Sequence, residues 1–316
     1  MKKLATEIID GRRLNRKDDL SFFIKADLEE LAEGANEIRR TLCGNHVDLC
    51  TIINGRSGRC PEDCKFCSQS SHNHTGCETY DMLDEETALR DCREKEAAGV
   101  HAYSIVTAGR TVEGEALDRL IHIYETLHRE CRIPLCASHG LLSADAFLRL
   151  KQAGVKRYHA NIETSRRNFP NICTTHSYDD KLREIQLAKE AGLEVCSGGI
   201  IGMGETWEDR IDMAVSLSEL EITSIPVNAL IPVPGTPFGS LAPLTEDEII
   251  RTMAIFRYLN PSAYIRMAAG RSYFKDGGMR LFASGVNAAI TGDMLTTTGT
   301  NMKQDFKMLH HMGFEC

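Results

Sequence analysis

The residues that decide the fold are Asp48-Leu-Cys-Thr-Ile-Ile53 and, after a short loop, Cys60-Pro-Glu-Asp-Cys64-Lys-Phe-Cys67. The first run is apolar and β-branched, so it predicts a buried strand. The second carries three thiols at C-x3-C-x2-C spacing. A βα barrel places its reactive groups in the loops that follow the carboxyl ends of its strands. The order of the two runs therefore predicts a reactive centre at the mouth of such a barrel.

Several centres can use closely spaced thiols. Structural zinc takes four ligands, usually in two separated pairs, and no second C-x2-C or H-x3-5-H pair follows nearby. A redox disulfide needs only two cysteines. An iron–sulfur cluster is held by thiolates, and with three of them one iron stays open to a substrate or cofactor. The spacing favours such a cluster, with structural zinc and unrelated buried thiols as the alternatives.

Apolar runs and amphipathic helical segments alternate along the chain. The predicted strands cover residues 48–53, 102–107, 134–138, 157–161, 194–201, 224–230, 264–268 and 286–291, and helices are clearest at 85–98, 143–153 and 178–191. Repeated strand–helix units imply parallel pairing, and eight of them close a barrel. We therefore expect an α/β protein with a TIM-type (βα)8 barrel over residues 46–316, preceded by a helical extension over residues 1–45.

Composition narrows the class of protein. The chain has 316 residues, of which 42% are hydrophobic and 26% charged, as in ordinary globular proteins. Its net charge of −8 argues against a nonspecific nucleic-acid partner. No apolar run reaches the roughly 18 residues of a membrane span, and the amino terminus does not resemble a signal peptide. We expect a cytoplasmic protein without a membrane partner, in which the grouped members of its 12 cysteines bind metal.

Polar residues end two of the predicted strands. On the fourth strand His159, Asn161 and Glu163 alternate with apolar neighbours, which suits a barrel that holds a polar ligand. A carboxylate such as Glu163 can accept hydrogen bonds from both hydroxyls of a ribose. The fifth strand continues into the glycine-rich segment 198–205, where a ligand can approach the backbone closely. The alternatives are an ordinary polar strand end and a tight strand-to-helix turn.

The cysteine trio resembles that of the radical S-adenosylmethionine (SAM) superfamily, C-x3-C-x-aromatic-C, with Phe66 in the aromatic position. The resemblance implies that Cys60, Cys64 and Cys67 bind a [4Fe-4S] cluster whose open iron chelates SAM. Reduction then cleaves SAM and yields a 5′-deoxyadenosyl radical that abstracts hydrogen. The residues implied in SAM binding, besides Phe66, are Asn161, Glu163, Gly198, Ile200 and Glu205.

From about residue 40 onward the chain is similar to the biotin synthase family. The segments that carry the similarity are Ser57-Gly-Arg-Cys-Pro-Glu-Asp-Cys-Lys-Phe-Cys-Ser-Gln-Ser70, Asn161-Ile-Glu-Thr-Ser165, Thr174-Thr-His-Ser-Tyr178, Val195-Cys-Ser-Gly-Gly-Ile-Ile-Gly-Met-Gly-Glu-Thr206, Ile225-Pro-Val-Asn228, Gly235-Thr-Pro237 and Arg266-Met-Ala-Ala-Gly-Arg271. The similarity implies a homodimeric barrel that inserts sulfur between C6 and C9 of dethiobiotin. It also implies an electron donor such as flavodoxin or ferredoxin, and His159, Asn161 and Asn228 as substrate-binding residues.

The family's sulfur donor is an auxiliary [2Fe-2S] cluster held by three cysteines and one arginine. By resemblance two of those cysteines are Cys136 and Cys196, and the arginine is Arg266; the remaining position on the second strand is Ser104. The family's Asn-His-Asn on the fourth strand also differs, reading His159-Ala-Asn161. Because a hydroxyl is a poorer ligand than a thiolate for iron–sulfur centres, three outcomes are open: no auxiliary cluster, weak ligation by Ser104, or another thiol and a rearranged, larger cluster.

We favour the third outcome, with Cys50 on the first strand as the replacement ligand. A buried apolar thiol at this position is the alternative. Other radical enzymes of the same barrel subgroup, such as the hydrogenase-maturation or methylornithine-forming type, are alternative functions. A noncatalytic iron–sulfur scaffold is a further alternative.

Overall fold

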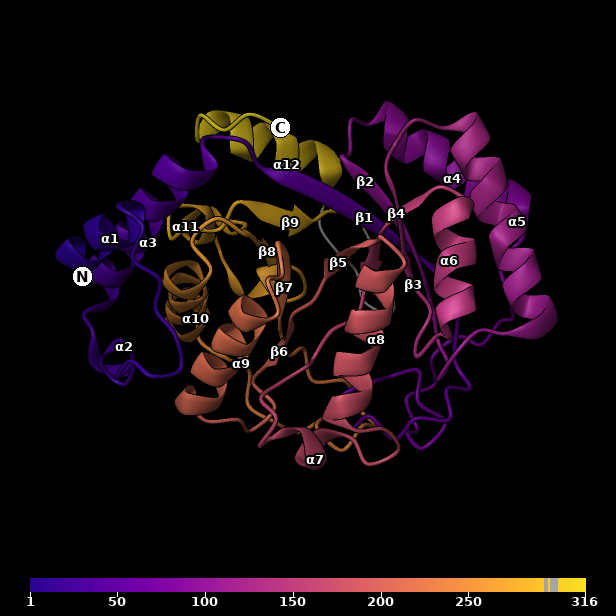
Figure 1. Ribbon diagram of the computed structural model, residues 1–316, viewed down its shortest axis with the longest axis horizontal. Coiled ribbons are helices and arrows are strands. Elements are labelled where there is room, and N and C mark those ends of the chain that lie inside the picture. The colour runs from indigo at the N-terminus through magenta and orange to yellow at the C-terminus, as the bar shows by residue number, and fades with distance from the viewer. Residues whose placement is uncertain (293–294, 296–300) are drawn as a thin grey trace.

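A closed parallel barrel forms the centre of the molecule (Figure 1). The computed structural model describes residues 1–292, 295 and 301–316. The strands are β1 (Asp48–Arg56), β2 (Ala102–Thr107), β3 (Leu135–Ser138), β4 (Val155–His159), β5 (Glu194–Cys196), β6 (Gly199–Ile201), β7 (Ser224–Ala229), β8 (Tyr264–Met267) and β9 (Ala288–Ile290). Their order is β5-β4-β3-β2-β1-β9-β8-β7-β6, and a β5–β7 pairing closes the ring. The predicted (βα)8 barrel is confirmed.

One predicted strand is interrupted. The run 194–201 forms two short strands, β5 and β6, which both pair with β7. The break lies at Ser197 and Gly198, where the backbone passes very close to β7: a Cβ on Gly198 would lie 1.8 Å from the carbonyl oxygen of Pro226. Only glycine fits this approach. β5 and β6 together therefore fill one of the eight strand positions of the barrel.

Helices surround the barrel and leave its two ends open to loops (Figure 1). They are α4 (Glu85–Ala97), α5 (Gly114–Glu130), α6 (Ala144–Gln152), α7 (Phe169–Ile172), α8 (Tyr178–Glu190), α9 (Trp207–Glu219), α10 (Glu246–Leu259), α11 (Met279–Phe282) and α12 (Met302–His311), with a 3-10 turn at Arg271–Tyr273. Capping boxes fix the starts of α8, α9 and α10 at Ser177, Thr206 and Thr245.

Three helices precede the first strand: α1 (Lys2–Ile9), α2 (Phe22–Lys25) and α3 (Leu28–Cys43). They lie beside α10 at one side of the barrel (Figure 1). The Arg251 guanidinium of α10 donates hydrogen bonds to the carbonyl oxygens of Phe23, at 3.0 Å, and Ala26, at 2.7 Å. The extension therefore covers the outside of the barrel, away from the loops that follow the strands.

Side chains alternate in direction along each strand, so the molecule has two buried regions, the core between barrel and helices and the lumen of the barrel. Outward-facing side chains such as Tyr103, Tyr158 and Ile225 are fully buried in the main core beneath the helices. Inward-facing Cys50, Ala102 and Cys136 form a second, small cluster of their own, against Ile290. The lumen of the barrel thus holds small and sulfur-bearing side chains where the outer layer holds large apolar ones.

Candidate active site

The three-cysteine loop follows β1 and is pinned by backbone hydrogen bonds. The amide of Cys60 donates to the carbonyl of Gln69 at 3.1 Å, and the Cys60 carbonyl accepts from Ser71 at 2.8 Å. Asn73 donates to the carbonyls of Cys64, at 3.1 Å, and Cys67, at 2.8 Å. The three thiols themselves form no disulfide and are only partly exposed. The backbone groups of the loop are therefore hydrogen-bonded, whereas its sulfur atoms remain available as metal ligands.

Burial favours the protonated form of two of these thiols, Cys60 and Cys67. It raises the pKa of Cys60 and raises that of Cys67 to about 11. A cation is then needed to hold them as thiolates at neutral pH, since metal binding displaces thiol protons. Three sulfur donors within one loop of eight residues fit an iron–sulfur cluster with one open coordination site.

A cavity of about 270 Å³ adjoins this loop at the mouth of the barrel. Among the residues lining it are Phe66, Cys67, Asn161, Glu163, Ile200 and Asn228. The structure therefore brings one cluster cysteine together with five residues that the sequence assigns to SAM or substrate. Gly198 and Glu205 do not line this cavity.

Glu163 is the most constrained residue of the cavity. Its φ of +65° lies in the left-handed region, which is uncommon for a residue other than glycine. Its amide donates to the Gly198 carbonyl at 3.1 Å, and its carbonyl accepts from the Ile200 amide at 2.8 Å. A Cβ on Gly199 would lie only 2.3 Å from the Glu163 carbonyl oxygen. These contacts hold the Glu163 side chain at the cavity.

One oxygen of the Glu163 carboxyl group is not satisfied by the described residues. Its Oε2 atom is buried and has no hydrogen-bond partner among the described residues. Burial raises its pKa to about 7. A buried acceptor without a donor is costly, so this oxygen fits a ligand that brings hydroxyl donors, such as a ribose.

Glu205 shapes the glycine-rich turn. Its carboxylate accepts hydrogen bonds from the amides of Gly202 and Met203, both at 2.7 Å, and from the Arg210 guanidinium at 2.7 Å. The side chain is 1% exposed. All the contacts of Glu205 hold the turn that follows β6.

A second sulfur-bearing layer lies in the lumen of the barrel. Strand register links its members around the ring: Cys50 with Ala102, Ser104 with Cys136, Cys136 with Arg157, His159 with Cys196, and Pro226 with Arg266. Cys50, Cys136, Cys196 and Arg266 are all buried, with exposures between 0% and 3%. The structure therefore gathers all four expected auxiliary ligands, which are dispersed over more than 200 positions of the sequence, in one layer.

Arg266 is the charged centre of this layer. Its guanidinium donates to the Cys50 sulfur at 3.2 Å and to the Ala289 carbonyl at 3.0 Å, and it forms an ion pair with the carboxylate of Asp48. Burial alone would lower its pKa, but Cys50 and Asp48 outweigh burial and raise it. Burial raises the pKa of Cys50 to about 11. A permanent cation therefore lies against a thiol in the barrel lumen.

Polar atoms in the layer lack partners within the described residues. They are Oγ of Ser104, Nε2 of His159 and Nε of Arg266. Burial, followed by the nearby arginines, lowers the pKa of His159 to about 3, so its imidazole is neutral. Each such atom would carry a cost of about 1–3 kcal/mol if the lumen held nothing polar. The layer fits an anionic group with acceptor atoms, as an iron–sulfur centre provides.

The sequence analysis missed two lumen residues. Asp48 is the carboxylate partner of Arg266, and Arg157 lies in register with both Cys136 and Glu194. Each stands two positions before a predicted site residue, Cys50 or His159. The period-two rule for strands was the available signal.

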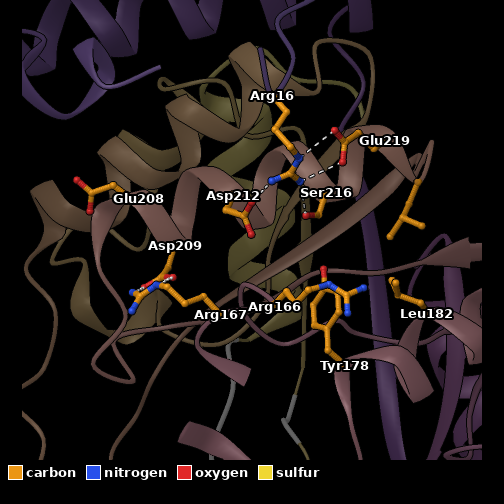
Figure 2. Close-up of a pocket in the computed structure, with 11 residues that line it drawn as sticks. Arg16, Arg166, Arg167, Tyr178, Leu182, Glu208, Asp209, Asp212, Ser216 and Glu219 are labelled. Atoms are coloured by element: carbon orange, nitrogen blue, oxygen red, sulfur yellow. Dashed lines mark hydrogen bonds and ion pairs between the residues drawn. The ribbon is translucent and has the colours of Figure 1, made fainter. Parts of the chain in front are cut away.

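A cavity of about 830 Å³ is lined by Arg16, by residues of α8 and α9 and by no cysteine (Figure 2). In it Arg16 reaches from the amino-terminal extension to α9, where it pairs with Asp212 and, at 3.0 Å, with Glu219. No residue that the sequence assigns to a cofactor or substrate lines this cavity. It is a groove on the outer surface where the extension docks.

Comparisons with known proteins define the class first. The family model of the radical SAM superfamily matches residues 56–217, and that of the biotin and thiamin synthesis associated domain matches residues 226–315. Together with the barrel and the three-cysteine loop, these matches make the chain a radical SAM enzyme.

The particular family follows from full-length relatives. Biotin synthase of Clostridium beijerinckii is 63% identical over 99% of both chains, and biotin synthase of Alkaliphilus metalliredigens is 60% identical over the same shares. The chain belongs to the biotin synthase family.

Solved structures support the fold. Methylornithine synthase aligns with a TM-score of 0.85 at 20% identity, covering 99% of this chain and 96% of its own. The FeFe-hydrogenase maturase of Carboxydothermus hydrogenoformans aligns with a TM-score of 0.81 at 17% identity, covering 99% and 79%. At such identities the likeness concerns the fold alone. Among the described helices, none is long and apolar enough to cross a bilayer.

Proposed function

We propose that this chain converts dethiobiotin to biotin by radical insertion of sulfur at C6 and C9. The observation that carries the proposal is the pairing of two sulfur layers in one barrel. The first is the three-cysteine loop at the mouth, and the second is the buried lumen ring of Cys50, Cys136, Cys196 and Arg266. An enzyme that only generates a radical needs the first layer, whereas one that also donates sulfur needs the second.

Cys60, Cys64 and Cys67 would hold the [4Fe-4S] cluster, and Phe66, Asn161, Glu163 and Ile200 would bind SAM beside it. When bound, these cofactors supply one-electron reduction and a carbon-centred radical. The protein's contribution is to orient SAM and exclude water. Glu163 would accept both ribose hydroxyls through its unpartnered oxygen. Gly198 and Glu205 act through the shape of the turn that carries Ile200.

In the lumen, Cys50, Cys136, Cys196 and Arg266 would hold the auxiliary iron–sulfur cluster, either [2Fe-2S] or a larger variant. Ser104 faces the same layer, but a thiolate is the better ligand for such a centre. Cys50 already contacts Arg266 at 3.2 Å, so it can supply the thiolate that the second strand lacks. Arg266 has an unpartnered Nε for the cluster or its sulfide.

The substrate would lie between the two layers. Asn161 and Asn228 line the mouth cavity and His159 lies in the lumen ring below it. The side-chain carbonyl of Asn161 accepts from the Gly198 amide at 3.1 Å, and Asn228 bridges Gly199 at 3.2 Å and Ala269 at 3.1 Å. These bonds fix the amides so that they can pair with a ureido ring. Neutral His159 can offer a hydrogen bond without adding charge.

The proposal extends to partners and compartment. The twelve cysteines are all free thiols, which fits a reducing cytoplasm. The open cluster site requires a one-electron donor of the flavodoxin or ferredoxin class. We also propose a homodimer, by analogy with the family.

The test is an anaerobic assay of reconstituted protein with SAM, dethiobiotin and a reductant. The expected products are biotin and 5′-deoxyadenosine, and Mössbauer spectra with iron and sulfide analysis should show two distinct clusters per chain. 5′-Deoxyadenosine without biotin, together with a single cluster type, would instead favour a radical enzyme of the hydrogenase-maturation or methylornithine-forming type. No cleavage of SAM at all would favour an iron–sulfur scaffold.

A further inference from the structure

A second group of metal-ligating side chains lies against the three-cysteine loop, on the side away from the SAM cavity. Its members are Cys64, Cys173 and His176. Cys173 directly follows α7, and the Lys65 amide donates to the Ile172 carbonyl at 2.9 Å. This backbone bond holds the two segments side by side. Cys173 is 2% exposed, and the proposed function gives it no role.

The spacing of the three donors is that of one tetrahedral metal ion. The sulfur atoms of Cys64 and Cys173 are 3.7 Å apart, and the Cys173 sulfur is 3.3 Å from Nδ1 of His176. All three ligand atoms lie within 4.8 Å of one another. Zinc–sulfur bonds of about 2.3 Å and zinc–nitrogen bonds of about 2.0 Å at tetrahedral angles separate two sulfurs by about 3.8 Å, and a sulfur from a nitrogen by about 3.5 Å.

We propose that, in the cluster-free chain, Cys64, Cys173 and His176 bind one thiophilic divalent cation of the Zn²⁺ type. Because Cys64 is also a ligand in the proposed function, occupation of this site and assembly of the [4Fe-4S] cluster exclude each other. Two thiolates and an imidazole are a donor set that suits Zn²⁺ and related ions.

Two carboxylates, Asp63 and Glu62, adjoin the site. Asp63 accepts from the Thr174 amide at 2.8 Å and lies 3.2 Å from the Cys173 sulfur, which fixes the position of that thiol. Oε2 of Glu62 lies 2.5 Å from Nδ1 of His176. A cation bound through Nδ1 would displace the proton between these two atoms, so this contact with Glu62 must open when the metal binds.

The site has its own approach from solvent. An open cavity of about 580 Å³ is lined by Cys173, His176 and the residues between and after them. It shares no lining residue with the cavity beside Phe66 and Glu163. A cation can therefore approach Cys173 and His176 through a cavity separate from the SAM cavity.

The test uses Co²⁺ as a spectroscopic probe in the cluster-free variant C60S/C67S. This background removes the competing three-cysteine set and keeps Cys64, Cys173 and His176. Titration under anaerobic conditions should give one Co²⁺ per chain with sulfur-to-cobalt charge-transfer absorption and the intense visible bands of a tetrahedral site. Adding C173S or H176Q should weaken binding by about 100-fold or more, since even outer-shell changes cost about 10–100-fold. Adding C77S, a thiol change in the segment that follows the three-cysteine loop, should leave binding unchanged.

Competition with the cluster provides the second measurement. In the wild-type sequence, prior addition of one Zn²⁺ per chain should delay cluster assembly from iron and sulfide, and C173S should assemble the cluster without that delay. Equal Co²⁺ binding with and without C173S and H176Q would overturn the proposal, as would Zn²⁺ inhibition that persists in C173S. Neither result would touch the proposed function, because cluster assembly and SAM cleavage by the metal-free wild type are measured separately.

Discussion

The two sulfur layers of this barrel are built in opposite ways. The mouth layer comes from eight consecutive residues, 60–67, and its thiols are partly exposed. The lumen layer comes from strands β1, β3, β5 and β8, and its ligands are almost completely buried. The first depends on local spacing and the second on strand register. Local spacing ties each ligand to one position of the loop, whereas strand register offers several neighbouring positions that face the lumen.

Ser104 and Cys50 illustrate that difference. Ser104 lies in register with Ile52, two positions beyond Cys50 on the adjacent strand. Because side chains two apart on a strand face the same side, both reach the lumen. A cysteine on β1 can therefore take the ligand role of the missing cysteine on β2 within the same layer. Cys60, Cys64 and Cys67 instead lie on a single loop that is fixed by its own backbone bonds.

We expect the largest loss of activity from a substitution in the three-cysteine loop at the mouth of the barrel. Cys64→Ala should abolish reductive SAM cleavage, measured as 5′-deoxyadenosine, because it removes one of three ligands of the open cluster. Iron and sulfide belonging to the lumen layer should remain, since none of its ligands changes. Cys77→Ala is the matched control, because Cys77 lies in the following loop and outside both layers. Full SAM cleavage by Cys64→Ala would refute the mouth assignment.

Cys50→Ala should affect the lumen layer and leave the mouth layer intact. We expect loss of auxiliary iron and of biotin formation, with 5′-deoxyadenosine still formed, because the mouth ligands are intact. Iron analysis, Mössbauer spectra and both products measure this. Cys92→Ala removes an equally buried thiol from the outer core and should keep the auxiliary iron. If Cys50→Ala keeps its auxiliary iron, Cys50 is only a buried apolar thiol. Ser104 would then be the remaining candidate for the fourth ligand.

Sequence reasoning predicted what depends on periodicity and failed where partners come from distant strands. The eight strand positions follow from periodicity, and alternation along the fourth strand also singled out Asn161 and Glu163, whereas the cavity residues Phe66, Ile200 and Asn228 were expected from the family resemblance. The break between β5 and β6 does not, because it arises from the approach of Gly198 to the Pro226 carbonyl.

Two further features could be recognised only in the folded chain. The Asp48–Arg266 ion pair joins the first strand to β8, which are neighbours of β9 only after the barrel closes. The full set of hydrogen bonds made by Glu205 depends on the turn's backbone geometry. In both cases the residue type was visible in the sequence and its partner was not.

Asp48→Asn tests how far the lumen layer depends on its ion pair. The substitution leaves Arg266 buried without its carboxylate, and breaking a buried pair from one side costs about 3–5 kcal/mol. We expect a loss near the lower limit, about 3 kcal/mol in the free energy of unfolding of the cluster-free protein, measured with urea. Asp212→Asn removes the partner of Arg16 at the surface, where about 0–1 kcal/mol is expected. Equal losses for the two variants would contradict the buried-pair interpretation.

The smallest effect concerns the pH dependence of SAM binding at the mouth. Burial raises the pKa of Glu163 to about 7, above the usual carboxyl value, so the group is protonated below pH 7 and ionised above it. The ionised form accepts both ribose hydroxyls, so affinity should rise with pH through 7 and be about tenfold weaker at pH 6 than at its upper limit. Equilibrium binding to the reconstituted protein measures this. His159 does not contribute, because its pKa of about 3 lies outside the range.

Two variants of Glu163 separate its charge from its shape. Glu163→Gln should bind SAM weakly at every pH between 6 and 8, because the amide has one acceptor oxygen and no titration. Glu163→Asp keeps a carboxylate and tolerates the left-handed backbone at φ +65°, so it should keep the slope at reduced affinity. In the cofactor-free chain the sign is opposite: a raised carboxyl pKa makes folding less favourable as pH rises from about 4.5 to 7. Binding and stability should therefore respond to pH in opposite directions at this residue, and a slope that survives in Glu163→Gln would place the titrating group elsewhere.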